Sequence, residues 1–167
     1  MDDLPEESAS KKKKGEKDST SSSGVKTPLI TLSGHTESIS SCQWIDEKTV
    51  STASWDHSIR VWDVFVGQEV RSLASSQSKI FLATDYSALN RLIAAGLNDS
   101  VVRVYDHRSA EGNLVKVALG SSATAAGWCS SVCWSKSSEH SLLTGSYDNL
   151  ARVWDIRKYK RKKEHRV

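Results

Sequence analysis

Three residue types that could form a hydrolytic triad occur close together in this chain. They are His35, Thr52 and Asp56. A triad needs an accessible hydroxyl, a base beside it and donors for the oxyanion. The sequence contains no G-x-S-x-G element that would expose a nucleophile, and Thr52 is expected on an inner strand that faces packed side chains. We therefore predict a structural role for these residues and no enzymatic activity.

Two cysteines offer a second kind of chemistry, because Cys129 and Cys133 could supply half of a zinc site. No second Cys/His pair stands at a ligand-like distance from them. Alternation along a strand places residues four apart on one face, so both are predicted to be free thiols that face the core. With Cys42 the total is odd, which argues against disulfides. Neither a metal nor a cofactor is expected.

The segment around Asp56 recurs along the chain. Three segments share one pattern, SWDHSIRVWD at 54–63, LNDSVVRVYD at 97–106 and SYDNLARVWD at 146–155. In each segment, an Asp is followed six residues later by an aromatic residue. Another Asp comes directly after the aromatic. These aromatics, Trp62, Tyr105 and Trp154, are 43 and 49 residues apart. A period near 40–45 residues with a terminal WD and an upstream GH, here at 34–35, is typical of WD40 propeller blades.

The pattern predicts an all-β fold, a partial WD40 β-propeller of about three four-stranded antiparallel blades. Alternation and turn residues place the strands at 38–45, 48–54, 58–64, 69–74, 80–86, 91–96, 101–106, 114–119, 129–135, 141–146 and 150–156. No helical signal is present. The segment PLITLSG at 28–34 is expected to be the outer strand of a further blade, and the third blade meets a basic tail where its fourth strand should begin. The predicted repeats span 27–67, 68–110 and 111–156.

Two polar segments flank the repeats. Residues 1–26 run from acidic to basic to Ser-rich and are expected to be disordered. The basic tail at 157–167 and the lysines at 11–14 could serve as nuclear localisation signals or attract RNA phosphates without sequence choice. No apolar run is long enough to span a bilayer and the N-terminus has no secretory signal. The chain is therefore assigned to the cytosol or nucleus, with no membrane and no small-molecule substrate.

Resemblance to WD40 proteins gives the triad-like residues a structural meaning. In that family the GH histidine, a Ser or Thr, the turn Asp and the Trp form a buried hydrogen-bonded tetrad. The resemblance implies this tetrad for His35, Thr52, Asp56 and Trp62.

The tetrad is less complete in the later repeats. The second repeat keeps Asp99 but has Ala95 and Tyr105 at the hydroxyl and Trp positions. The third repeat lacks the GH but keeps Thr144, Asp148 and Trp154.

A closer resemblance covers about residues 25–157. VKTPLITLSGHTESISSCQWIDEKTVSTASWDHSIRVWDVFVGQEV, NRLIAAGLNDSVVRVYDHRSAEGNLV and SLLTGSYDNLARVWDIR are similar to three middle blades, of seven, in the WD-repeat subunit of the pescadillo–BOP complex. The resemblance implies a scaffold role in large ribosomal subunit assembly and precursor rRNA maturation, in the nucleus and nucleolus. It also implies BOP-type and pescadillo-type partners and the pre-ribosomal particle. That family has an N-terminal ubiquitin-like domain that is not found here, so we expect a fragment of a longer propeller.

Partner contacts in propellers often involve the residue before the turn Asp, here Trp55, Asn98 and Tyr147. Large amphipathic aromatics suit interface hot spots, although these residues could equally cover the packing between blades. An alternative function is a WDxR-type substrate adaptor of a cullin ubiquitin ligase, because Arg108 and Arg157 follow the YD and WD pairs. A generic WD40 adaptor also remains open.

Overall fold

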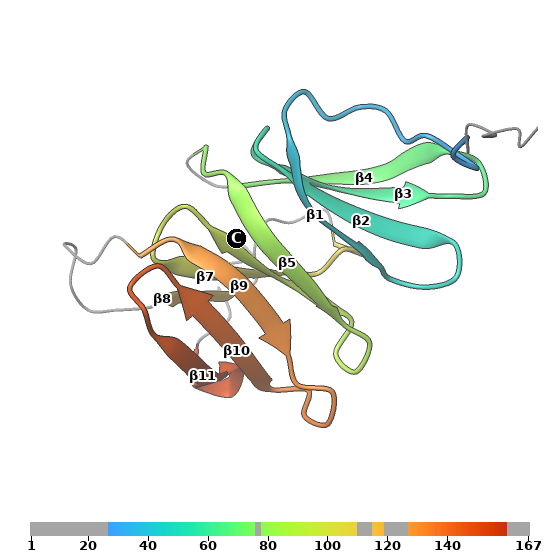
Figure 1. The fold of residues 1–167 in the computed structure, drawn as a ribbon. Coiled ribbons are helices and arrows are strands. Elements are labelled where there is room, and N and C mark those ends of the chain that lie inside the picture. Colours follow the sequence, from blue (N-terminus) through green and yellow to red (C-terminus); the bar gives the residue numbers. More distant parts are fainter. Residues whose placement is uncertain (1–26, 76–77, 110–114, 119–126, 160–167) are drawn as a thin grey trace, which may run out of the picture.

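A computed structural model describes residues 27–75, 78–109, 115–118 and 127–159 (Figure 1). These residues form three antiparallel sheets in which neighbouring strands follow one another in sequence. The first sheet contains β1 (Ile39–Trp44), β2 (Thr49–Ser54), β3 (Ser58–Asp63) and β4 (Gln68–Ala74). The second contains β5 (Phe81–Ser87), β6 (Leu92–Leu97), β7 (Val101–Tyr105) and β8 (Val115–Ala118). The third contains β9 (Cys129–Trp134), β10 (Ser141–Ser146) and β11 (Ala151–Asp155).

This architecture confirms the predicted fold class of a partial propeller. Each strand begins and ends within one residue of the bounds expected from the sequence. The third sheet has three strands in the described part of the chain. Residues 160–167, where we expected basic residues in place of a fourth strand, lie outside that part. Sheets and sequence repeats are offset by one strand, since β4 belongs to the first sheet but lies in the second repeat.

Two details of the prediction were wrong. Residues 28–34 form no strand, because an outer strand needs a neighbouring third strand, and the described residues offer none on that side. Leu29 is fully exposed there, whereas the following residues bend back over the first sheet. A short 3-10 helix at Ile156–Lys158 was also not expected. Asp155 caps it by accepting a hydrogen bond from the backbone N–H of Arg157.

The inner strands β1, β5 and β9 lie side by side, and the outer strands spread away from them (Figure 1). One apolar core fills the space between the first and second sheets, and another fills the space between the second and third. The central strand β6 touches both cores, and all six of its residues are buried. Burial of these apolar faces is the main force that holds the blades together.

A bulge near the start of each inner strand corrects the prediction for the cysteines. In the third blade the pairing with β10 shifts between Gly145 and Ser146, so the bulge falls between Cys129 and Ser131. The extra residue reverses the alternation. Cys129 is therefore buried in the core while Cys133 is exposed on the opposite face. Burial raises the pKa of the Cys129 thiol to about 11.

No helix among the described residues is long and apolar enough to cross a membrane. The expected disorder of 1–26 and most of the basic tail lie outside the described residues.

Candidate interaction site and its supporting network

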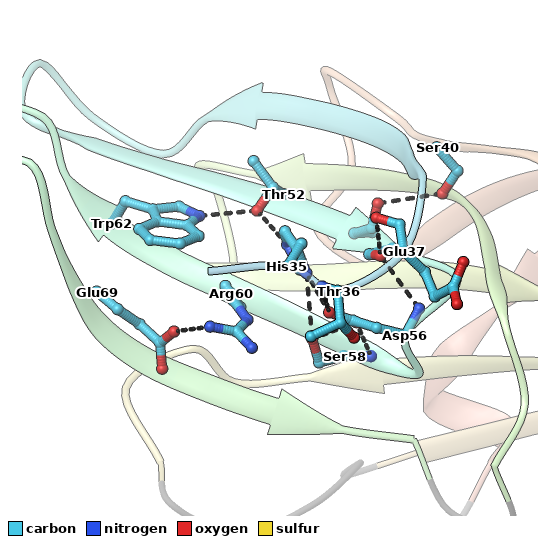
Figure 2. Close-up of polar contacts among 12 residues, drawn as sticks. His35, Thr36, Glu37, Ser40, Thr52, Asp56, Ser58, Arg60, Trp62 and Glu69 are labelled. Carbon is cyan, nitrogen blue, oxygen red and sulfur yellow. Dashed lines mark hydrogen bonds and ion pairs between the residues drawn. The ribbon is translucent and has the colours of Figure 1, made fainter. Parts of the chain in front are cut away.

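The first blade brings together the four residues of the expected tetrad (Figure 2). The indole N–H of Trp62 donates to the Thr52 hydroxyl at 2.7 Å. The same hydroxyl lies 2.7 Å from His35 Nε2, and His35 Nδ1 lies 2.7 Å from Asp56 Oδ2. A carboxylate can only accept, so His35 donates from Nδ1 to Asp56, and the tautomer with its one proton on Nδ1 accepts the Thr52 O–H at Nε2. Every donor in this chain from indole to carboxylate thus has an acceptor.

Asp56 collects further donors because it occupies the turn between β2 and β3. The Ser58 backbone N–H and side-chain hydroxyl both donate to Oδ1, at 3.0 and 2.6 Å, and the Thr36 N–H donates to Oδ2 at 3.2 Å. Burial raises the pKa of Asp56, but the hydrogen bonds from Ser58 and His35 outweigh it and hold the pKa well below its ordinary value. The carboxylate therefore fixes both the turn and the loop that precedes β1.

The second blade anchors its turn aspartate in a different way. Arg103 donates from Nη1 and Nη2 to the two carboxylate oxygens of Asp99, at 3.0 and 2.7 Å. The Arg103 side chain is only 2% exposed. It lies opposite Ala95 in the strand register, at the position where the first blade has Arg60 opposite Thr52. Tyr105 is fully buried, its hydroxyl has no hydrogen-bond partner among the described residues, and burial raises its pKa to about 12.

The third blade combines the two solutions. The Trp154 indole N–H donates to the Thr144 hydroxyl at 2.8 Å, as in the first blade. Asp148 pairs with Arg152 at 2.8 Å, as in the second blade. The hydrogen bond from Arg152 lowers the pKa of Asp148.

The arginine partner was missed in the sequence, although a signal for it was present. An arginine stands four residues after the turn aspartate in all three repeats, at Arg60, Arg103 and Arg152. In the first blade His35 occupies the carboxylate, and Arg60 instead pairs with Glu69 at 2.6 Å (Figure 2). In the second and third repeats, which lack the GH histidine, this arginine pairs with the turn aspartate instead.

The candidate partner-binding residues lie at the end of the blades that carries these turns. Trp55 is 47% exposed and Tyr147 is 68% exposed. Asn98 is half-buried, and its side-chain oxygen accepts the Ile80 backbone N–H at 3.1 Å. Trp128 was not among the predicted residues, yet it is 45% exposed and its ring lies 6.0 Å from that of Tyr147. Trp128 stands just before β9, so its place beside the turn follows from blade geometry and not from the repeat pattern.

The arginines of the two WDxR-like segments are held by their own aspartates. Arg157 donates from Nε and Nη2 to Asp155, with a shortest distance of 2.6 Å, and Arg108 pairs in the same way with Asp106 at 2.7 Å. The hydrogen bonds from Arg157 lower the pKa of Asp155 to about 2. Each arginine therefore pairs with the carboxylate two residues before it. They give both arginines a local role.

No group of three or more His, Cys, Asp or Glu side chains in the described part of the chain is placed to hold a metal ion.

Comparison with known proteins identifies the repeats. The family described as "WD domain, G-beta repeat" matches residues 26–63 and 118–155, which leaves out the second repeat with its altered tetrad. "Ribosome biogenesis protein WDR12 homolog" of Nematostella vectensis is 42% identical over 133 residues, covering 80% of this chain and 31% of that protein. The Anopheles gambiae protein of that name is 40% identical over 156 residues, covering 93% of this chain and 34% of its own length.

Two solved structures share the fold. "Structure of U3-55K" and "Crystal structure of RRP9 WD40 repeats" each superpose with a TM-score of 0.66 at 20% identity, over 79% of this chain. They are covered over 40% and 39% of their lengths. The chain spans about a third of the length of the WDR12 homologues it matches. The chain is therefore built of WD40 repeats, folded as consecutive blades of a β-propeller and similar in sequence to the ribosome biogenesis protein WDR12 homologues.

Proposed function

We propose that this protein is a non-catalytic interaction scaffold in ribosome biogenesis, which supports large-subunit assembly and precursor rRNA maturation. The observation that carries the proposal is the 42% identity to a ribosome biogenesis protein WDR12 homologue over 133 residues. The Anopheles gambiae relative is similar over 156 of the 167 residues, a length that must include all three blades, among them the second, which departs most from the WD40 pattern. The proposed site of action is the nucleus and nucleolus, with BOP-type and pescadillo-type assembly factors as partners.

The state of the triad-like residues supports a role without catalysis. The Thr52 hydroxyl is engaged by both the Trp62 indole and the His35 imidazole, and Thr52 is 8% exposed. A nucleophile must reach its substrate, whereas this hydroxyl faces packed side chains. The three residues fix the structure of a blade and leave recognition to its surface.

The proposed contact surface is the end that carries the turns, with Trp55 and Tyr147 as anchors. Both side chains are exposed, and the backbone of each residue is held by a hydrogen bond to the neighbouring inner-strand segment. The Trp55 N–H donates to the Ser38 carbonyl and the Tyr147 N–H donates to the Trp128 carbonyl, each at 3.0 Å. Rigid aromatic side chains of this kind lose little entropy on binding and dominate many interfaces. Contact with RNA is proposed to be electrostatic and without sequence choice.

The test is recovery of the BOP-type protein by the tagged full chain. Trp55→Ala combined with Tyr147→Ala should lower recovery by roughly tenfold or more, as expected for loss of hot-spot aromatics. Phe65→Ala is the matched control, because Phe65 is 75% exposed in the loop between β3 and β4, at the other end of its blade. Equal recovery by all three proteins would refute the aromatic anchors. Failure of the unaltered chain to recover the partner would refute the scaffold role of these blades.

A further inference from the structure

The second blade is bounded on both sides by described blades. Its inner strand β5 contacts β1 of the first blade and β9 of the third. The turns that follow these three inner strands lie at one end of the blades, opposite the end that carries Trp55 and Tyr147 (Figure 1). A cavity of about 340 Å³ lies among these turns, and residues of all three blades line it.

The lining of this cavity is largely apolar. Ile45 stands in the turn after β1, and Trp134 ends β9. Tyr86 lies near the end of β5, and Leu89 lies in the turn that follows. Leu89 is 53% exposed although its blade has a neighbour on each side. Apolar walls with a few polar groups are typical of ligand pockets, and the burial of such walls favours binding.

Hydrogen bonds hold the turns around the cavity in place. The side-chain amide of Asn90, in the turn after β5, donates to the backbone carbonyl of Glu139 in the third blade at 2.5 Å. In the turn after β9, the Ser135 hydroxyl accepts the backbone N–H groups of Ser137 and Ser138, at 3.3 and 3.1 Å. A binding site with walls that are already ordered loses little conformational entropy when a ligand enters.

The cavity carries a positive charge and no negative one. Among the described residues that line it, none has a carboxylate, and Lys136 is the one with a formal charge. The Lys136 side chain is exposed, and the nearby Glu139 carboxylate contacts His140 at 3.1 Å. A complementary ligand therefore combines an apolar group with an anionic one. An acidic peptide that contains an aliphatic side chain has both.

We propose that this cavity binds an extended acidic segment of a partner protein. One aliphatic side chain of the segment packs between Ile45 and Leu89, and a neighbouring Asp or Glu carboxylate of the segment pairs with Lys136. The proposed function assigns partner contacts only to the end that carries Trp55 and Tyr147. A second site at the opposite end lets the same three blades hold two partners at once.

The experiment titrates the full chain into labelled eight-residue peptides and follows their fluorescence anisotropy. Each peptide has one leucine, isoleucine, valine or methionine flanked by glutamates. Leu89→Ala should weaken binding of the tightest peptide about fivefold, because apolar wall is removed. Lys136→Gln should weaken it about threefold, and should abolish the preference over a peptide in which glutamines replace the glutamates.

Two matched controls lie away from the cavity. Val70 is 62% exposed on the outer strand β4, and Lys79 is half-buried just before β5, at the end that carries the turn aspartates. Val70→Ala and Lys79→Gln should both bind the peptide as the unaltered chain does. Trp55→Ala combined with Tyr147→Ala should also leave peptide binding unchanged, so failure of the anchors and failure of the cavity are told apart.

Reversal of the charge tests the ion pair through a gain of binding. Lys136→Glu should prefer a lysine-flanked peptide to the glutamate-flanked one, and this gain also shows that the variant is folded. No binding of any peptide by the unaltered chain, or equal binding of the glutamate and glutamine peptides, would overturn the proposal. Displacement of the peptide by an oligouridylate would overturn it in favour of nucleic acid. Loss of peptide binding at concentrations where the mass of the chain doubles would overturn it in favour of a second copy.

Discussion

Replacing Thr52 by valine tests whether the tetrad of the first blade is a stabilising unit. The change keeps the shape of the side chain and removes the hydroxyl that links Trp62 to His35. Trp62 is 2% exposed and the His35 side chain is 4% exposed, so water cannot easily replace the lost partner. A buried polar group left unsatisfied costs about 1–3 kcal/mol. With two such groups, Thr52→Val should lower the free energy of unfolding by about 2–6 kcal/mol.

The third blade provides the internal comparison. Thr144 is more deeply buried than Thr52, at 1% against 8% exposed, but its hydroxyl meets only the indole of Trp154 among the printed contacts of its blade. Trp154 is half-buried, so water can reach part of its ring. Thr144→Val should therefore cost about 1 kcal/mol. Burial alone would predict the opposite order, so the comparison separates the effect of the network from that of depth.

The free energy of unfolding of both variants is measured by denaturant unfolding of the full chain, with tryptophan fluorescence as the signal. Because repeat proteins can open one unit at a time, hydrogen exchange of the β2 and β3 amides should report the local loss in Thr52→Val. A cost of Thr52→Val equal to or below that of Thr144→Val would refute the reasoning. So would unchanged exchange in β2 and β3.

Five further substitutions probe other parts of the blades. The hydrogen bonds that lower the pKa of Asp56 stabilise the fold fully above pH 3.8, the ordinary pKa, and this stability is lost as the pH falls toward the lower folded-state pKa. Asp56→Asn should therefore lose less stability than the unaltered chain when the pH is lowered. Circular dichroism during an acid titration measures the difference. Arg103→Met should cost about 3–5 kcal/mol in denaturant unfolding because it leaves a carboxylate unpaired beside the core. Arg152→Met, at a more exposed pair, should cost much less, and equal costs would contradict the difference in burial. Gly96→Ala should lower the free energy of unfolding by about 1–3 kcal/mol through overpacking, because its Cβ would lie 2.5 Å from a backbone carbonyl of the next blade. The loss is measured as a lower melting temperature. Gly145→Ala, where the nearest atom is 3.5 Å away, should be neutral.

The sequence could predict the strands because both of their causes are local. Alternation marks the buried faces, and the turn aspartates mark where each hairpin reverses. The tetrad of the first blade could be assigned by resemblance for the same reason, since each member has a fixed place in the repeat. The prediction of a strand at residues 28–34 was wrong, because an outer strand needs a neighbouring strand that the described residues do not provide.

The errors at Cys133 and Arg103 have a different origin. Simple alternation placed Cys133 in the core, but a one-residue bulge moved it to the opposite face. The partner of Asp99 was missed because the tetrad pattern predicts only a histidine, a hydroxyl residue and a Trp, and the second repeat lacks all three. The arginine four residues after each turn aspartate was a signal for an ion pair within the hairpin, and the structure shows Arg103 buried in that pair.

The three ways of holding the turn aspartate bear on the proposed contact surface. Trp55 immediately precedes Asp56, and the network that fixes this carboxylate also draws in the loop before β1 through Thr36 and His35. Tyr147 precedes Asp148, whose partner Arg152 lies in the same hairpin. The first anchor therefore depends on a contact between segments far apart in sequence, whereas the second is held locally. We expect Thr52→Val to weaken partner recovery through Trp55 while leaving the contribution of Tyr147 intact, so that combining Thr52→Val with Trp55→Ala adds little to Trp55→Ala alone. Additive losses would show that the tetrad supports the blade but does not position the anchor.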